Sequence, residues 1–313
     1  MEAITKSVKM NFWNGKNVAI TGAGGFLGGH FVSKLIDLGA IVKVLSREEL
    51  DLTNSIEVTK VLRNIEVVIN CAALDGNSEF KKNHPAEILD TNMRIASNIL
   101  AAARDNNISD VVLISSSEIY SSYAPNPIKE EDDYRLYGGH TSNGYILSKR
   151  FGEILADLYR EQYSLRVYFP RLSNIFGPGD HFGDLSTRVI PSFIDKILKG
   201  DTIEIWGDGS QTRQFIYVED AVVAIMAMVE NQSVGALNIS TSETITILNL
   251  AKKVSSLLGV KAKLKLDISK STGSQDRVLD ISKMTNLVGS SSLMSLDDGL
   301  SKTLEWYKEK INK

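Results

Sequence analysis

The sequence is poor in the residues that hold disulfide scaffolds and metal centres together. It contains one cysteine, Cys71, and four histidines among its 313 residues. A single cysteine cannot form an intrachain disulfide, and so few thiols and imidazoles provide no zinc-ligand spacing. We therefore expect a protein of a reducing compartment, with neither a disulfide framework nor a structural metal.

Long apolar runs and an excess of positive charge are also missing. No run of about eighteen consecutive apolar residues occurs, and residues 1–16 are polar, without the apolar core of a secretory signal. Lysine and arginine total 35 against 38 acidic residues, which gives a net charge of −3. This balance provides no overall attraction to nucleic acid or anionic lipid. We expect a cytoplasmic protein that binds neither nucleic acid nor a membrane.

The first half of the chain does contain a regular alternation of strand and helix patterns. Strands are expected at 17–21, 41–45, 66–70, 110–115 and 165–172, and helices at 28–38, 56–62, 85–106 and 145–162. Parallel strands require crossover connections, and right-handed crossovers place helices on the sheet faces. The order therefore predicts an α/β fold with a doubly wound parallel sheet.

The alternation becomes irregular after residue 177. Helices are expected there only over 189–199, 220–230 and 296–312, separated by stretches rich in glycine and proline. We predict a sheet domain over residues 15–172 and a smaller lobe over residues 173–313 that interleaves with it.

A glycine pattern stands where the first strand meets the first helix, in the segment VAITGAGGFLGGHFV. Gly22, Gly25 and Gly28 stand between the strand and the head of the helix, with Phe26 and Leu27 between the last two glycines. In a dinucleotide site, the first glycine allows a tight turn, the second admits the pyrophosphate, and the third lets helix pack on strand. The spacing is GxxGxxG rather than GxGxxG. Its strand–loop–helix context predicts an NAD(P) site, the alternative being a structural turn.

The end of the second strand bears on which dinucleotide binds. An acidic residue there would hold the ribose of NAD, whereas a basic residue would hold the 2′-phosphate of NADP. The sequence has Ser46 and Arg47 at this point, followed by Glu48 and Glu49. Because a guanidinium pairs well with phosphate, NADP is modestly favoured. A solvated surface arginine is the alternative, and NAD is not excluded.

Three serines end the fourth strand, and a Tyr–Lys pair follows further along the chain. Tyr145 and Lys149 are four positions apart in a predicted helix, so their side chains share one face. An ammonium group beside a phenol lowers the phenol pKa, which makes it usable as an acid or base toward a hydroxyl or ketone. Such a pair also occurs on ordinary helix surfaces. Its place after the glycine loop and the serine-ended strand favours a catalytic role.

Taken together, these segments resemble the extended short-chain dehydrogenase/reductase family of nucleotide-sugar epimerases, dehydratases and reductases. The resemblance covers residues 16–310 and rests on TGAGGFLG, NCAA at 70–73, TNM at 91–93, SSSEIY, YILSK, RLSNIFGPGD, WGDGSQTRQFIYVEDA and DRVLDISK. It implies a Rossmann domain that binds NAD(P) and a C-terminal lobe that binds a nucleoside diphosphate sugar. It also implies a homodimer in which helices 85–106 and 145–162 form a four-helix bundle; the alternative is a monomer.

The resemblance also assigns roles to individual residues. Ser116 would hydrogen-bond the reacting sugar oxygen, Tyr145 would move the proton, and Lys149 would anchor the nicotinamide ribose. Arg213 and Arg277 would clamp the diphosphate, because arginine binds phosphate with two donors; for Arg277 a solvent-facing role stays open. Further cofactor contacts are implied for Asp51, Leu52, Ala72, Ala73, Asn92 and Ser115, and further substrate contacts for Ser117, Asn174, Arg188, Val189 and Trp206.

Other residues near the expected site have two interpretations. Cys71 follows a core strand, which favours a packed small side chain over a nucleophile. Lys81, Lys82 and His84 follow the NCAA segment and either contact the substrate or belong to an ordinary loop.

Within the family, SREELDLTN, HPAEILDTNMRIASNIL and RVIPSFI are most similar to GDP-fucose synthases. Those enzymes reduce a keto group at sugar carbon 4 and use a Cys–His pair to epimerise carbons 3 and 5. Glu118 and Arg188 stand at these two positions here, so proton exchange at carbons 3 and 5 has no evident catalyst. We expect hydride transfer at carbon 4 by a dehydrogenase, ketoreductase or 4-epimerase, with a weak preference for GDP-sugars and with Glu118 near carbons 5 and 6.

Other chemistries in the same family are less favoured. Dehydratases carry Thr-Asp-Glu where this chain has Ser116, Ser117 and Glu118, so the acid for 4,6-dehydration is missing. Ser-Glu together with Arg213 also resembles UDP-glucuronate decarboxylases, but Arg47 replaces the acidic ribose ligand expected where NAD is held tightly. A dinucleotide-sensing scaffold without activity is the non-enzymatic alternative, and the intact Ser–Tyr–Lys set argues against it.

Overall fold

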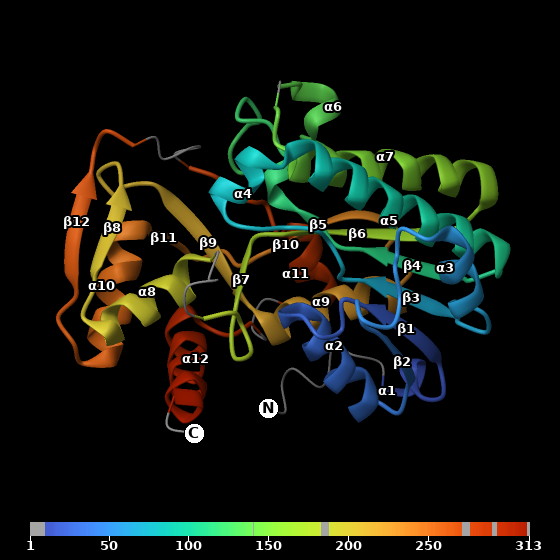
Figure 1. Cartoon of the computed structure of the whole chain (residues 1–313), viewed down its shortest axis with the longest axis horizontal. Helices are drawn as coiled ribbons and strands as arrows, with labels where there is room; N and C mark the ends of the chain where they lie inside the picture. The colour runs from blue at the N-terminus through green and yellow to red at the C-terminus, as the bar shows by residue number, and fades with distance from the viewer. Residues whose placement is uncertain (1–9, 140, 183–187, 271–275, 290–292, 312–313) are drawn as a thin grey trace.

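The computed structural model describes residues 10–139, 141–182, 188–270, 276–289 and 293–311. Its centre is a parallel sheet with the strand order β10-β6-β4-β3-β1-β2, in which the short β5 (Ser115–Ser116) also pairs with β6 (Figure 1). This confirms the predicted doubly wound sheet. The main strands are β1 (Asn17–Thr21), β2 (Ile41–Leu45), β3 (Val67–Asn70), β4 (Asp110–Leu113), β6 (Arg166–Leu172) and β10 (Gly235–Ile239).

Helices cover both faces of this sheet. Alternate residues of a strand point to opposite faces, so Val18 and Ile20 belong to one core cluster and Ala19 to the other. The first cluster lies under α2 (Phe26–Asp37), α9 (Val218–Glu230) and α11 (Ser282–Val288). The second lies under α3 (Ser55–Val61), α5 (Pro85–Asp105) and α7 (Gly144–Tyr163).

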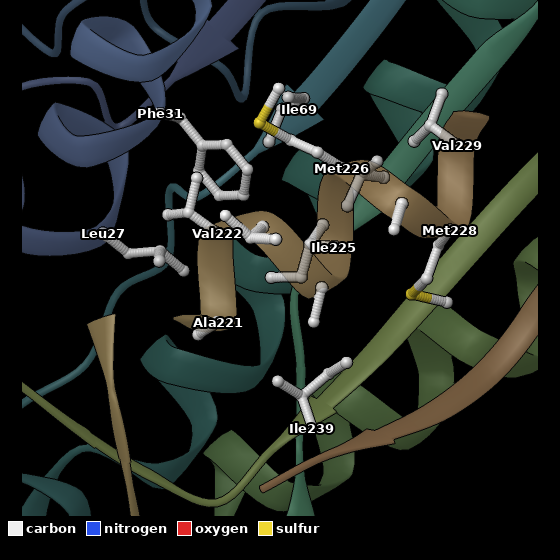
Figure 2. Packing of buried hydrophobic residues seen from close by; sticks show 14 of the residues in the cluster. Leu27, Phe31, Ile69, Ala221, Val222, Ile225, Met226, Met228, Val229 and Ile239 are labelled. Carbon is white, nitrogen blue, oxygen red and sulfur yellow. The ribbon is translucent and has the colours of Figure 1, made fainter. Parts of the chain in front are cut away.

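Helix α9 lies in the first core cluster and is buried along its length except at Glu219. Its apolar side chains pack against α2 and the sheet, and Figure 2 shows Leu27 and Phe31 beside Val222. Burying one such side chain contributes about 1.5–3 kcal/mol. The second half of the chain therefore contributes to the sheet domain, because β10 pairs with β6 and α9 packs on the sheet.

The remaining elements form a smaller lobe, at the left of Figure 1. Its strands are β7 (Asn174–Phe176), β9 (Thr212–Tyr217) and β11 (Thr244–Thr246) in one sheet, and β8 (Thr202–Trp206) and β12 (Lys263–Asp267) in another. Helices α8 (Val189–Lys199), α10 (Ile247–Leu258) and α12 (Leu296–Ile311) enclose a third core cluster with them. Of the helices that the structure describes, none combines the length and apolarity that a bilayer crossing requires.

Short helical segments complete the fold. They are α1 (Met10–Trp13), α4 (Ser78–Asn83), η2 (Ser117–Ile119) and α6 (Tyr134–Tyr137). Both α4 and η2 follow strands of the central sheet, β3 and β5 respectively. They therefore lie at the carboxyl edge of the sheet, where doubly wound folds place their ligands.

Candidate active site

A cavity of about 830 Å³ opens at the carboxyl edge of the central sheet, against the smaller lobe. A volume of this size matches ordinary ligand pockets. The structure brings together here most of the residues that the sequence analysis selected. These are Gly22, Gly25, Phe26, Leu27, Gly28, Ala73, Ser115, Ser116, Ser117, Glu118, Tyr145, Lys149, Asn174, Arg188, Val189, Arg213 and Arg277.

Other selected residues lie outside the lining of this cavity. Ala72 and Asn92 line a small adjoining pocket together with Ser115 and Lys149. The Asn92 side chain accepts a hydrogen bond from the Leu74 N–H at 2.7 Å and donates one to the Leu74 carbonyl at 2.9 Å. Asn92 therefore fixes the loop that follows β3, and its predicted contact with a cofactor stays a prediction.

The loop after β2 and the end of β8 carry the remaining selected residues. The Ser46 hydroxyl donates to Glu49, and Arg47 is exposed. A hydrogen bond from Thr53 lowers the pKa of Asp51, and the Leu52 carbonyl accepts from Asn98. Trp206 is 46% exposed in the smaller lobe, with the Lys270 ammonium 5.2 Å from its ring centroid. Their predicted ligand contacts also stay predictions.

The glycine loop has the geometry that a dinucleotide requires. Gly22 has a φ of +65°, and a Cβ there would lie 2.8 Å from the Ala72 nitrogen. A Cβ on Gly28 would lie 2.2 Å from the Gly22 carbonyl oxygen, so only glycine lets α2 pack this closely on the loop. Both positions therefore require glycine, and the predicted contacts of the loop with a cofactor stay predictions.

Helix α2 begins at the cavity with Gly25 as its N-cap, and no side chain caps it. The N–H groups of its first turn lack partners within the helix and carry partial positive charge. These groups, together with the narrow glycine cradle, fit a pyrophosphate, so the residues present suit NAD(P).

The serine and the tyrosine lie within reach of each other. Ser116 is in β5, its hydroxyl accepts from the Glu118 N–H at 3.1 Å, and it hydrogen-bonds with Tyr145. Asn143 caps the start of α7, accepting from the Tyr145 N–H at 3.0 Å. Lys149 lies one turn later; its Nζ donates to the Ile114 carbonyl at 2.7 Å and is 5.4 Å from the Tyr145 ring centroid.

The charge environment of Tyr145 differs from the one predicted. Burial raises the pKa of Tyr145 above its ordinary value, and the carboxylates of Asp75 and Glu118 raise it further. Burial also lowers the pKa of Lys149 to about 8. The prediction that a nearby ammonium lowers the Tyr145 pKa is wrong in its net direction, because desolvation outweighs the favourable charges. Tyr145 therefore holds its proton at neutral pH, as an ordinary tyrosine does, and is a weaker acid than one.

Three arginines contribute positive charge to the cavity. The Arg277 Nη1 donates to the Ser117 carbonyl at 3.3 Å, and burial lowers the pKa values of Arg213 and Arg277, while the nearby Glu118 carboxylate raises both. Arg188 precedes α8, donates to Asp180 at 2.8 Å, and lies 5.0 Å from the ring centroid of Phe26 at the start of α2. This arrangement suits a diphosphate, since arginine binds phosphate with paired donors.

Comparison with known proteins agrees with this geometry. Residues 18–240 match the model of the NAD dependent epimerase/dehydratase family. The chain belongs to this family. A dTDP-4-dehydro-6-deoxy-D-allose reductase of Streptomyces sp is 41% identical to it, with 95% of this chain and 97% of the relative covered. A putative GDP-L-fucose synthase of Arabidopsis thaliana is 30% identical, with 94% of this chain and 92% of the relative covered.

A solved reductase has the same fold. The GDP-mannoheptose C4 reductase of Campylobacter jejuni, solved with NADP bound, aligns with a TM-score of 0.82 at 26% identity. The alignment covers 95% of this chain and 99% of that structure. The site is therefore to be compared with the sites of extended short-chain dehydrogenases/reductases, as the motifs predicted.

For some residues that line the cavity of this epimerase/dehydratase family member, the sequence analysis gave either no role or two interpretations. Asp180, in the NIFGPGD segment, is buried, and its Oδ2 has no hydrogen-bond partner among the described residues. Asp75 follows NCAAL and pairs with Lys81 at 3.0 Å, and Lys81 contacts the Tyr145 ring. Its place in the loop that follows β3 was the available signal for Asp75. Cys71 also lines the cavity, and burial raises the pKa of its thiol to about 12, as expected of a packed side chain.

Proposed function

We propose that this chain is a 4-ketoreductase of a nucleoside diphosphate 6-deoxysugar with NADPH as its preferred reductant. The observation that carries the proposal is one cavity in which Ser116, Tyr145 and Lys149 lie beside a glycine loop and a set of arginines. The 41% identity to a reductase named for a 4-dehydro-6-deoxy sugar supports the same reaction.

The side chains divide the work of reducing the ketone. NADPH, held at the glycine loop, would supply the hydride for carbon 4 and would be oxidised to NADP⁺. The Tyr145 phenol, which holds its proton at neutral pH, donates that proton to the carbonyl oxygen as the oxygen gains charge. The Ser116 hydroxyl, hydrogen-bonded with Tyr145, orients the same oxygen. Lys149 is fixed by the Ile114 carbonyl and places a cation near the phenolate that results.

The cavity favours reduction without epimerisation. Arg188 stands at the position where the similar GDP-fucose synthases have the histidine of their acid/base pair. Unlike a histidine, a guanidinium keeps its protons in proteins. Glu118 lies near Arg213 and Arg277, and its carboxylate raises the pKa values of both guanidinium groups. Neither group is placed as an acid/base pair for carbons 3 and 5. Those carbons are therefore proposed to keep their hydrogens through turnover.

The nucleotide and the cofactor follow from different observations. The relative at 41% identity is named for a dTDP-sugar and the one at 30% for a GDP-sugar, so we propose a dTDP-linked substrate in place of the weak GDP preference. NADP is proposed because Arg47 is exposed at the end of β2 and the Campylobacter reductase holds NADP.

The proposal is tested with the purified full chain. dTDP- and GDP-linked 4-keto-6-deoxyhexoses are supplied with NADPH in deuterated water, and the products are examined by NMR. We expect reduction at carbon 4 with no solvent deuterium at carbons 3 and 5. Tyr145→Phe is expected to lose about a hundredfold or more in kcat, the usual contribution of a general acid, with NADPH affinity unchanged.

Three results would contradict the proposal. The first is turnover retained by Tyr145→Phe, and the second is absence of reduction with both sugars. The third is release of carbon dioxide from UDP-glucuronate with NAD, which would establish the decarboxylase alternative instead.

A further inference from the structure

A second lysine lies against the Tyr145 ring, from outside the Tyr–Lys motif. The Nζ of Lys81 is 4.5 Å from the ring centroid, nearer than the 5.4 Å of the Lys149 Nζ. Lys81 belongs to α4, the short helix that follows β3 and lines the cavity. Two ammonium groups from different elements therefore contact one phenol ring.

The surroundings hold Lys81 in this place. Its Nζ pairs with the Asp75 carboxylate at 3.0 Å, and its side chain is 20% exposed. Asn77 caps α4 by accepting from the Phe80 N–H at 2.8 Å, and Asn92 fixes the preceding Leu74. A partly exposed ion pair contributes little to stability by itself. The importance of this ion pair is that it holds the Lys81 ammonium group against the Tyr145 ring.

We propose that Lys81 is a positioning residue that stabilises the phenolate of Tyr145, with Asp75 holding Lys81 on the ring. The inference rests on the proposed role of Tyr145 as proton donor. A cation on an aromatic face is attracted by the ring, and the attraction grows once the ring carries a negative charge. A contact that is stronger after proton transfer than before it lowers the barrier.

The effect of Lys81 on the Tyr145 phenol depends on the other charged groups around the ring. The Asp75 carboxylate makes Tyr145 a weaker acid, and Lys81, paired with that carboxylate, offsets its charge. We therefore expect Asp75 and Lys81 to act as a unit. Among the described residues, the other charged or titratable groups that act on Tyr145 or lie at its ring are Lys149 of α7, Glu118 of η2 and Arg188 at the start of α8.

A titration of the phenol tests the inference without any substrate. A fluorinated tyrosine, whose more acidic phenol titrates while the protein is folded, replaces Tyr145 and is followed by ¹⁹F NMR. Lys81→Met removes the charge and keeps the apolar stem, and the matched control is Lys82→Met, an exposed residue of the same helix. We expect Lys81→Met to lower the acid dissociation constant about tenfold and Lys82→Met to leave it unchanged. Equal effects, or no effect of Lys81→Met, would overturn the proposal.

Turnover gives the second measurement. Lys81→Met is expected to lower kcat about tenfold with little change in KM, and Lys81→Arg to restore most of the rate. In an Asp75→Asn background, the loss caused by Lys81→Met should be smaller, because the two residues are coupled. A rise in KM alone would overturn the proposal by making Lys81 a substrate contact. A shifted titration in a protein that reduces no nucleotide sugar would instead reject the proposed function and keep the phenolate role.

Discussion

The proposed preference for NADPH can be tested at a single residue. Arg47 lies exposed after β2, where a 2′-phosphate would be held. Arg47→Ala should raise the KM for NADPH about tenfold or more, since a hydrogen bond to a charged group is lost, and should change that for NADH little. Initial rates with both reductants measure the ratio. Arg63→Ala, at another exposed arginine of the same domain, is the control, and an unchanged ratio for Arg47→Ala would remove the basis for NADP.

For individual residues, the sequence predicted the positions of the motif residues better than it predicted their pKa values. Gly22 and Gly28 were predictable because backbone sterics act locally, within one loop. The pKa of Tyr145 was not, because it depends on burial and on Asp75, which reaches the ring through the fold of a separate segment. The contact between Lys81 and Tyr145 was unpredictable for the same reason.

Among the elements, helix α7 begins at a glycine, Gly144, that has no room for a side chain. A Cβ on Gly144 would lie 2.0 Å from the Pro85 carbonyl oxygen, and backbone cannot move aside cheaply. Gly144→Ala should therefore destabilise the chain by about 1–3 kcal/mol, and it should also displace Tyr145 and reduce kcat. Denaturant unfolding and initial rates measure both effects.

The same helix offers a matched control. A Cβ on Gly152 would meet only the Ala96 Cβ at 3.9 Å, an ordinary contact. Gly152→Ala should be neutral or stabilise by up to about 1 kcal/mol, because alanine favours the helix. If both variants lost the same stability, the contact with Pro85 would not explain the effect of Gly144.

The elements also show where sequence patterns are sufficient. Long periodic helices such as α5 and α7, the buried strand β1 and the edge strand β2 lie within one or two residues of the predicted bounds. In the smaller lobe, β7 and β11 were not predicted, since they have three residues each and pair with β9, a segment distant in the sequence. Helix α10 was missed although its buried Leu250, Ala251 and Val254 have helical spacing.

The largest open question for the whole molecule is its assembly. Helices α5 and α7 pack side by side on one face of the sheet, and α7 exposes Ile154 and Leu158, 44% and 54% accessible. These residues are four positions apart and so share one helix face. Apolar residues grouped on an exposed helix face suit a two-fold interface, in which the same patch meets itself. The predicted homodimer thus has a defined surface to test.

Light scattering after size exclusion tests this surface directly. The chain is expected to elute with the mass of a dimer, and Ile154→Glu combined with Leu158→Glu with that of a monomer, because an interface would bury four unpaired carboxylates. Leu257→Glu, at a similarly exposed leucine of α10, should stay dimeric, and circular dichroism should show all variants folded. A monomeric parent chain, or a double variant that remains dimeric, would show that α7 only covers the sheet. Because α7 also carries Tyr145 and Lys149, a fall in kcat on dissociation would connect assembly to the position of the phenol.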